Sequence, residues 1–138
     1  MDWCNIPDEL LITRPEAFYG TATCITMPAP RHLELTQSTI DYSSLVERTR
    51  SPEAGAVVLF LGTVRELTAG KQTESLDYEA YPEMAIRQLH ALIDEAESRW
   101  PVIQSGVIHR LGHLDLGEIA VAVTVSCPHR REAFEAGQ

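Results

Sequence analysis

The stretch GAVVLFLGTVR, residues 55–65, decides the fold. It is a continuous apolar run between glycines, and Arg65 closes it. A run of this kind is typical of a strand that is buried on both faces of a sheet. We therefore expect residues 55–65 to form such a strand, with Arg65 at the point where it ends.

Two further segments alternate apolar and polar residues, as half-buried strands do. One is HLELTQ, residues 32–37, and the other is TESLDYEAY, residues 73–81. Between the apolar run and residues 73–81 lies ELTAGK, which has the composition of a loop. We expect residues 55–65 and 73–81 to pair with each other across this loop.

Two helices are expected from capping and periodicity. The first covers residues 42–50, is capped by Asp41 and turns Leu45 and Val46 inward. The second covers residues 82–100, with proline in its first turn and a second proline directly after its end. Its apolar residues follow steps of three and four, which makes it amphipathic; they are Ile86, Leu89, Ile93, Ala96 and Trp100.

The C-terminal third predicts two more strands, residues 102–110 and 118–126, separated by the glycine-bearing turn LGHLDLG. Residues 1–31 contain four prolines and no sustained period, so we interpret them as an N-terminal extension. Residues 32–138 then form one domain, whose order of strands and helices indicates an α+β fold with a largely antiparallel sheet.

Composition limits the partners and the compartment. The 138 residues carry a net charge of −9, which argues against nucleic acid and against an anionic membrane surface. Three widely spaced cysteines, Cys4, Cys24 and Cys127, suggest neither a disulfide framework nor a thiolate metal site. With Asp2 where a signal peptide would be basic, and no membrane-length apolar run, we expect a cytoplasmic protein.

Cationic side chains follow two of the predicted strands. Arg65 ends one strand, and His129 and Arg130 follow another, with Arg131 next to them. We expect the two groups to converge at one edge of the sheet, where they would suit a phosphate or carboxylate. The alternative is that these arginines are solvated or pair with neighbouring carboxylates, namely Glu66, Glu132 or Glu135.

Three other patterns favour a structural explanation. His109 and His113 lie four residues apart, but the segment between them predicts a turn and nothing completes a four-ligand metal site. Cys127 at a strand end is typical of a small buried hydrophobe. The acidic residues around the strand 73–81 are predicted to form its solvent face; they are Asp77, Glu79 and Glu83.

Five motifs in order resemble those of one family, the large, catalytic subunit of molybdopterin synthase. They are GAVVLFLGTVR, LDYEAYPEMA, AESRWPV, VIHRLGHLDLGE and VAVTVSCPHRREAFEAGQ. The resemblance runs from Gly55 to Gln138 and is weaker over residues 32–54.

The resemblance implies an α/β-hammerhead fold and a sulfurtransferase of molybdenum cofactor biosynthesis. In the family, a small ubiquitin-like carrier subunit brings sulfur as a C-terminal thiocarboxylate to cyclic pyranopterin monophosphate (precursor Z), forming the molybdopterin dithiolene. The large subunits form a homodimer with one carrier at each far end, a heterotetramer. No permanently bound cofactor and no metal is implied.

Carried onto this chain, the family's substrate-binding residues match Thr63, Val64 and Arg65 at the first strand end and His129 and Arg130 at the second. The strand's pocket aromatic matches Phe60. The family usually has lysine where Thr63 stands. Arg131 falls at a variable position, and His109 with Arg110 matches a motif of structural character.

The family's two functional lysines lie in a segment after AFEAGQ, beyond Gln138, where this sequence stops. Lys71 matches neither, so the catalytic residues are left unassigned. This departure favours an alternative, in which the chain is a non-catalytic, degenerate paralogue that binds the pterin. Under this alternative, we expect the gene product to have a mass of 15.3 kDa. An unrelated anion-binding α+β enzyme is the third hypothesis.

Overall fold

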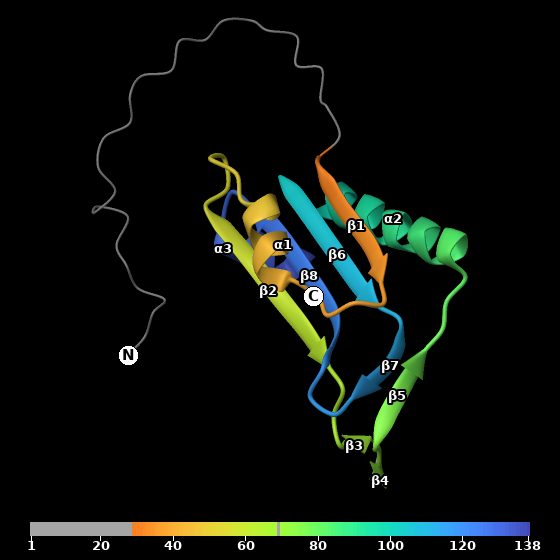
Figure 1. Ribbon diagram of the computed structural model, residues 1–138. Coiled ribbons are helices and arrows are strands. Elements are labelled where there is room, and N and C mark those ends of the chain that lie inside the picture. Colours follow the sequence, from red (N-terminus) through yellow and green to blue (C-terminus); the bar gives the residue numbers. More distant parts are fainter. Residues whose placement is uncertain (1–28, 69) are drawn as a thin grey trace, which may run out of the picture.

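The structure, a computed structural model, describes residues 29–68 and 70–138. Its centre is a four-stranded sheet in the order β1-β6-β8-β2 (Figure 1). In chain order the elements are β1 (Arg31–Thr36), α1 (Tyr42–Thr49), β2 (Ala56–Thr63), β3 (Leu67–Thr68), β4 (Lys71–Gln72), β5 (Ser75–Tyr78), α2 (Pro82–Arg99), β6 (Gln104–Arg110), β7 (Gly112–Asp115), β8 (Ile119–Cys127) and α3 (Arg130–Ala136).

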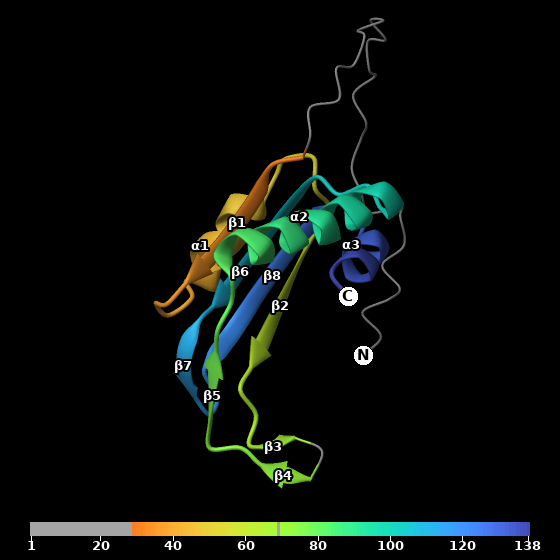
Figure 2. The same cartoon turned by 90° about the vertical axis from the view of Figure 1, so that its right-hand side faces the viewer.

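The helices cover both faces of this sheet. Figure 2 shows α1 on one face and α2 with α3 on the other. In the part of the sheet that the structure describes, β1 and β6 pair in parallel, whereas β8 is antiparallel to both β6 and β2. The predicted α+β domain with a largely antiparallel sheet is confirmed.

Both predicted helices form, each ending one residue earlier than expected. The Asp41 carboxylate accepts a hydrogen bond from the Ser44 N–H at 3.0 Å, which caps α1 as predicted. In α2, Ile93 is buried, and Arg99 stacks its guanidinium 4.4 Å from the centre of the Trp100 ring.

The core between α1 and the sheet depends on a close approach at Gly106. A Cβ there would lie 2.6 Å from Leu45 Cδ1, so only glycine lets α1 pack this closely on β6. Beside it, the buried Thr49 hydroxyl is 2.8 Å from the Thr124 hydroxyl of β8. This packing holds α1 against the middle of the sheet.

The expectation that residues 55–65 are buried on both faces is wrong for the single chain. β2 is an edge strand, and β8 is its neighbour in the sheet. Leu59 is 37 % exposed and Phe60 is 52 % exposed. Apolar composition predicted the strand but not its position in the sheet, because composition does not report how many neighbours a strand has.

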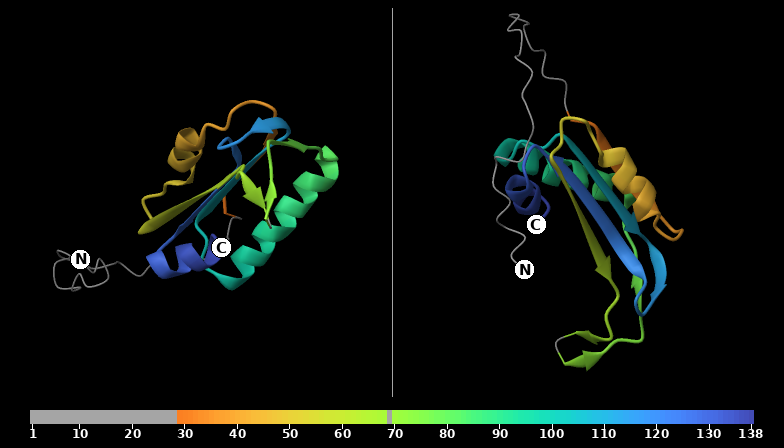
Figure 3. Two further views of the ribbon diagram at one scale, coloured as in Figure 1. Left: turned by 90° about the horizontal axis from the view of Figure 1, so that it is seen from below. Right: turned by 90° about the vertical axis from the view of Figure 1, so that its left-hand side faces the viewer.

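The predicted pairing of residues 55–65 with residues 73–81 is also wrong. β5 pairs instead with β7, which occupies the segment predicted as a turn, from Tyr78↔Gly112 to Ser75↔Asp115. The intervening loop forms the small β3–β4 hairpin at the lower end of the molecule (Figure 3). The chain thus leaves the main sheet after β2 and returns to it only at β6.

Two expectations concern the ends and the surroundings of the domain. The proposed extension over residues 1–31 lies outside the described residues except for residues 29–31, and Arg31 already belongs to β1. Within the described ranges, no helix has the length and apolar character needed to cross a membrane.

Candidate functional site

Arg65 is positioned by its neighbour Val64. The Val64 side chain is 3 % exposed and packs with Leu114 and Ala120. Its backbone N–H donates to the Glu118 carbonyl at 3.0 Å, and its own carbonyl accepts from the Gly117 N–H at 2.8 Å. Because Val64 is fixed on both sides, the side chains before and after it are directed away from the core.

Thr63 and Arg65 are accordingly exposed at the end of β2. Among the residues that the structure describes, Arg65 makes no side-chain hydrogen bond and no ion pair. Arg65 is therefore not paired with Glu66, and its exposed side chain fits both the solvated alternative and an anion site. A guanidinium without a carboxylate partner keeps all its donors for an anion.

His129 and Arg130 lie at the start of α3, and both are exposed. The loop that carries them lies directly against the beginning of β2. The Pro128 carbonyl is so close to Gly55 that a Cβ on this glycine would collide with it. α3 then packs on the sheet through Ala133, which is buried with Val125 and Cys127. The start of α3 thus has a fixed place beside the start of β2.

Within one chain, the two cationic groups do not meet. β2 and β8 are antiparallel, with Ala56 opposite Cys127 and Thr63 opposite Ile119. Arg65 follows the end of β2, whereas His129 lies beside its beginning, so the length of the strand, about 25 Å, separates them. The expected convergence at one edge of the sheet is wrong for the single chain, because antiparallel neighbours end at opposite edges.

Phe60 lines an apolar groove of about 590 Å³ between α2, α3 and the sheet. Its walls include Leu92 and Trp100 of the α2 region and Val121 and Val123 of β8. The floor contains the Ser105 hydroxyl, which is buried and has no hydrogen-bond partner in the described structure. Phe60 thus lines a concavity on the face that carries α3, and its assignment to the substrate pocket stays a prediction.

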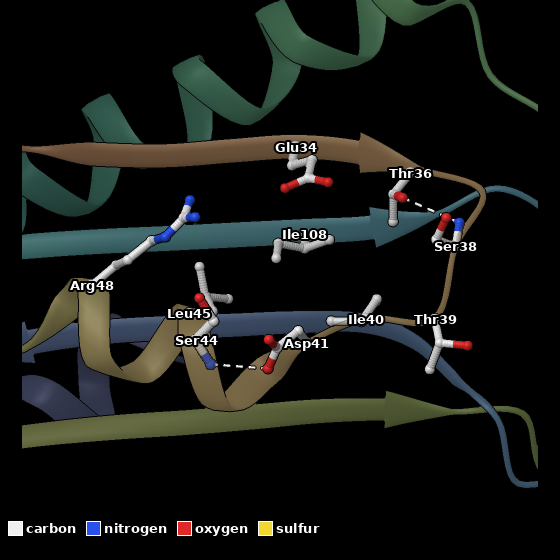
Figure 4. A pocket seen from close by; sticks show the side chains of 10 residues that line it. All are labelled: Glu34, Thr36, Ser38, Thr39, Ile40, Asp41, Ser44, Leu45, Arg48 and Ile108. Atoms are coloured by element: carbon white, nitrogen blue, oxygen red, sulfur yellow. Dashed lines mark hydrogen bonds between the residues drawn. The ribbon is translucent and has the colours of Figure 1, made fainter.

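A second, polar cavity of about 290 Å³ lies on the opposite face, between α1 and β1 (Figure 4). In Figure 4, Glu34 projects from β1, Ile108 from β6, and Leu45 and Arg48 from α1. None of the predicted site residues lines it.

Cys127 and Arg131 have structural surroundings, as the sequence indicated. The Cys127 side chain is fully buried, and burial raises the pKa of its thiol, with the nearby Glu132 carboxylate adding to the effect. The thiol is therefore a small core group. Arg131 Nε donates to Glu135 Oε1 at 2.9 Å across one turn of α3.

The histidines and acidic residues in and beside the β5–β7 strand pair form structural contacts. The His109 ring packs edge-to-face on Tyr78 with centroids 5.3 Å apart. The Glu118 carboxylate accepts a hydrogen bond from the Asp115 N–H at 2.9 Å and pairs with the Arg110 guanidinium at 2.9 Å. The hydrogen bond from Asp115 first, and the Arg110 contact second, lower the pKa of that carboxyl. The sequence did not indicate the ion pair between Arg110 and Glu118, because the pair depends on how the chain between β6 and β8 folds back on itself.

His113 Nδ1 lies 3.1 Å from the Asp77 carboxylate, and Nε2 lies 3.6 Å from Asp115. The hydrogen bond to Asp77 is the main reason why the pKa of His113 is raised. All three side chains are more than half exposed, so Asp77 does belong to the predicted solvent face. In the described ranges, no group of three or more histidine, cysteine or acidic residues is placed to hold a metal ion.

Comparison with known proteins identifies relatives over most of the chain. Residues 35–138 match the family model described as MoaE protein. The chain is 43 % identical over 105 residues to the molybdopterin synthase catalytic subunit of Bacillus subtilis (strain 168), covering 76 % of this chain and 67 % of that protein. It is 44 % identical over 105 residues to the corresponding subunit of Thermoplasma volcanium, covering 76 % and 77 %.

Solved structures give the same picture. The crystal structure of molybdopterin synthase from Staphylococcus aureus superimposes with a TM-score of 0.70 and 42 % identity, covering 75 % of this chain and 76 % of that chain. A Helicobacter pylori complex of subunits 1 and 2 of molybdopterin-converting factor shares the fold, with a TM-score of 0.61, 20 % identity and coverage of 75 % and 70 %.

Proposed function

The chain belongs to the MoaE protein family, and we propose from this premise that it is the catalytic subunit of a molybdopterin synthase. In this proposal it transfers sulfur from the C-terminal thiocarboxylate of a small ubiquitin-like carrier subunit to cyclic pyranopterin monophosphate. The acceptor becomes the dithiolene of molybdopterin. The relatives with this printed function support the proposal, and they do not favour the alternative of a non-catalytic paralogue.

Arg65, His129 and Arg130 are the residues that we assign to the anionic pterin, with Thr63 and Val64 beside Arg65. The observation that carries this assignment is the exposed Arg65 guanidinium, which has no carboxylate partner in the described structure and is fixed by the buried Val64. A phosphate offers this fork the paired oxygens that it binds best. Phe60 would contribute an apolar wall.

One chain cannot apply all three cations to one small substrate, because the length of β2 separates Arg65 from His129. We propose that two copies of the chain form the substrate site together. Arg65 of one copy and the partner's His129 and Arg130 would then hold the same substrate. A two-fold dimer contains two such composite sites, since every contact in it occurs twice.

The sulfur chemistry is not assigned to any of the residues of this sequence. Its one lysine, Lys71, lies exposed on the β3–β4 hairpin. An amine that captures or polarises the carrier's acyl group has to reach the carrier's C-terminus. For sulfur to reach its acceptor, the carrier's C-terminus also has to approach the bound pterin.

In this proposal the pterin is a substrate and no cofactor stays bound. The assembly is a homodimer of this subunit with one carrier at each end. We place it in the cytoplasm because its cysteines suggest no disulfide framework and Cys127 is a free, buried thiol.

The test is a sulfur-transfer assay with the purified chain, a thiocarboxylated carrier and cyclic pyranopterin monophosphate. Mass spectrometry follows the incorporation of two sulfur atoms into the pterin and the conversion of the carrier's thiocarboxylate into carboxylate. The proposal predicts both changes. Binding of the pterin without either change would support the non-catalytic paralogue, and absence of binding would reject the site.

A further inference from the structure

The polar cavity between α1 and β1 contains none of the residues that we assign to the pterin. Its volume is about 290 Å³, and a second hollow of about 200 Å³ adjoins it along β1. The two hollows share four lining residues, which are Glu34, Leu45, Arg48 and Ile108. A ligand in this cavity is separate from the proposed substrate, so an inference about it goes beyond the proposed function.

Two elements supply the polar side chains of the cavity. In β1, Glu34 and Thr36 lie two residues apart and therefore share one face of the strand. In α1 and its cap, Asp41, Ser44 and Arg48 follow steps of three and four residues, which places them along one side of the helix. Figure 4 shows the Arg48 side chain extending from α1 in the direction of β1. A polar row of the helix thus faces a polar row of the strand.

Glu34 and Arg48 carry opposite charges but do not pair. Among the residues that the structure describes, neither side chain makes a hydrogen bond or an ion pair. The neighbouring Arg50 shows the usual outcome, since its guanidinium contacts the Glu47 carboxylate at 2.9 Å. An unpaired guanidinium and an unpaired carboxylate in one cavity keep their donors and acceptors for a ligand that carries both charges.

We propose that this cavity binds a small zwitterion, namely an α-amino acid with a short side chain. The Arg48 guanidinium holds the ligand's carboxylate through two parallel N–H···O hydrogen bonds. The ligand's ammonium group donates to the Glu34 carboxylate, and it has two further N–H donors. The Ser44 hydroxyl and Asp41 Oδ2 can accept these, because in the described structure it is Asp41 Oδ1 that accepts from the Ser44 N–H.

The charges of the lining disfavour other small ligands. A simple anion would meet Arg48 but also the carboxylates of Glu34 and Asp41, which repel it. A simple cation would be attracted by the carboxylates but repelled by the unpaired guanidinium. A zwitterion satisfies both kinds of charge at once.

The size of the cavity limits the side chain of the ligand. Ligand pockets usually span about 300–1,000 Å³, so this cavity lies at the lower end of that range. Its apolar lining consists of Ile40, Leu45 and Ile108, and the first two are buried. A short aliphatic side chain, as in L-alanine or L-valine, therefore fits this lining better than a long or aromatic one.

An NMR titration of the full chain with L-alanine and L-valine tests the site. We expect saturable shifts of amide signals in β1 and α1 at millimolar concentrations, because so small a ligand forms few contacts. L-tryptophan is the size control and should give no such shifts. The methyl ester of the tighter ligand lacks the carboxylate, and its N-acetyl derivative lacks the ammonium group. Each derivative should bind at least about tenfold more weakly than the free amino acid.

Variants locate the two charges. Arg48→Gln and Glu34→Gln each remove one charge and should weaken binding of the amino acid at least about tenfold. Arg50→Gln and Glu47→Gln are the matched controls, because this exposed pair belongs to the same helix region and does not line the cavity. Arg48→Gln should make no further difference to the methyl ester, and Glu34→Gln none to the N-acetyl derivative, since the contact is already missing.

Three results would overturn the proposal. The first is the absence of saturable shifts with both short amino acids. The second is equal weakening by the site variants and by their controls. The third is a derivative that binds as tightly as the free amino acid, because the cavity would then recognise one charge only. Binding of cyclic pyranopterin monophosphate is measured separately, so the failure of this inference leaves the proposed function in place.

Discussion

At the scale of the residue, the candidate site depends on buried neighbours that fix exposed cations. Val64 has both backbone hydrogen-bonding groups occupied and its side chain in the core. The backbone from which the Arg65 side chain extends is therefore held in place. Gly55 has the corresponding role for the loop before His129, since it allows contact with Pro128. The sequence indicated the cations themselves, because each follows a recognisable strand. It did not indicate which buried residues hold them.

Replacing either assigned arginine tests the substrate contacts. Arg65→Ala and Arg130→Ala are each expected to weaken binding of cyclic pyranopterin monophosphate by about 1–3 kcal/mol, because each removes charge-assisted hydrogen bonds to an anion. Isothermal titration calorimetry measures the affinity. Arg48→Ala is the control, since Arg48 is an exposed arginine of the α1 face. If Arg65→Ala and Arg130→Ala bind the pterin as tightly as Arg48→Ala does, the assignment is contradicted.

Gly55→Ala tests the close contact between the start of β2 and the loop before α3. The added methyl group collides with a backbone carbonyl that cannot rotate away, so we expect a loss of about 1–3 kcal/mol in the free energy of unfolding. Gly137→Ala is the graded control, because its Cβ would lie 3.1 Å from the nearest atom and its φ is negative. Urea unfolding compares the two, and a similar midpoint for both would contradict the contact.

At the scale of the element, the sequence predicted the two long helices and the four strands of the main sheet, but not how all the strands pair. Periodicity reports which residues share a face. It carries no information about the neighbour of a strand, so β5 was assigned to β2 although it pairs with β7. The segment of β7 predicts a turn because it contains Gly112 and is followed by Gly117. Both glycines have positive φ, but Gly112 is the first residue of β7 and only Gly117 lies in the turn before β8.

The β5–β7 ribbon is expected to be sensitive to pH through His113. Its pKa is raised in the folded protein, mainly by Asp77, so protonated His113 favours the folded ribbon. The stabilisation is fully present below the unfolded value of about 6.5 and is lost as the pH rises through the folded pKa.

Two measurements check this. An NMR titration should place the pKa of His113 above its ordinary value, and Asp77→Asn should lower it. Amide exchange in β5 and β7 should become faster from mildly acidic to mildly alkaline conditions, after correction for intrinsic rates, and His113→Asn should abolish that change. A His113 pKa that does not respond to Asp77→Asn would contradict the contact.

At the scale of the whole molecule, one chain cannot bring its two cationic groups to a single small substrate. The sequence predicted that the two cationic groups belong to one site, and this stays a prediction. It also predicted that they meet at one edge of the sheet, which is wrong within the chain because β2 and β8 run in opposite directions. Strand direction follows from topology, and topology was the part that the sequence left open.

The most direct test of the composite site uses two defective variants together. Arg65→Ala and Arg130→Ala chains are co-expressed with different tags, and only dimers that carry both tags are purified. In such a dimer one site lacks both arginines, while the other keeps Arg65 from one chain and Arg130 from its partner. Calorimetry with cyclic pyranopterin monophosphate should then show wild-type affinity at about half of the wild-type number of sites, because a two-fold dimer has two equivalent sites. If the mixed dimers bind no better than either variant alone, the composite site is contradicted.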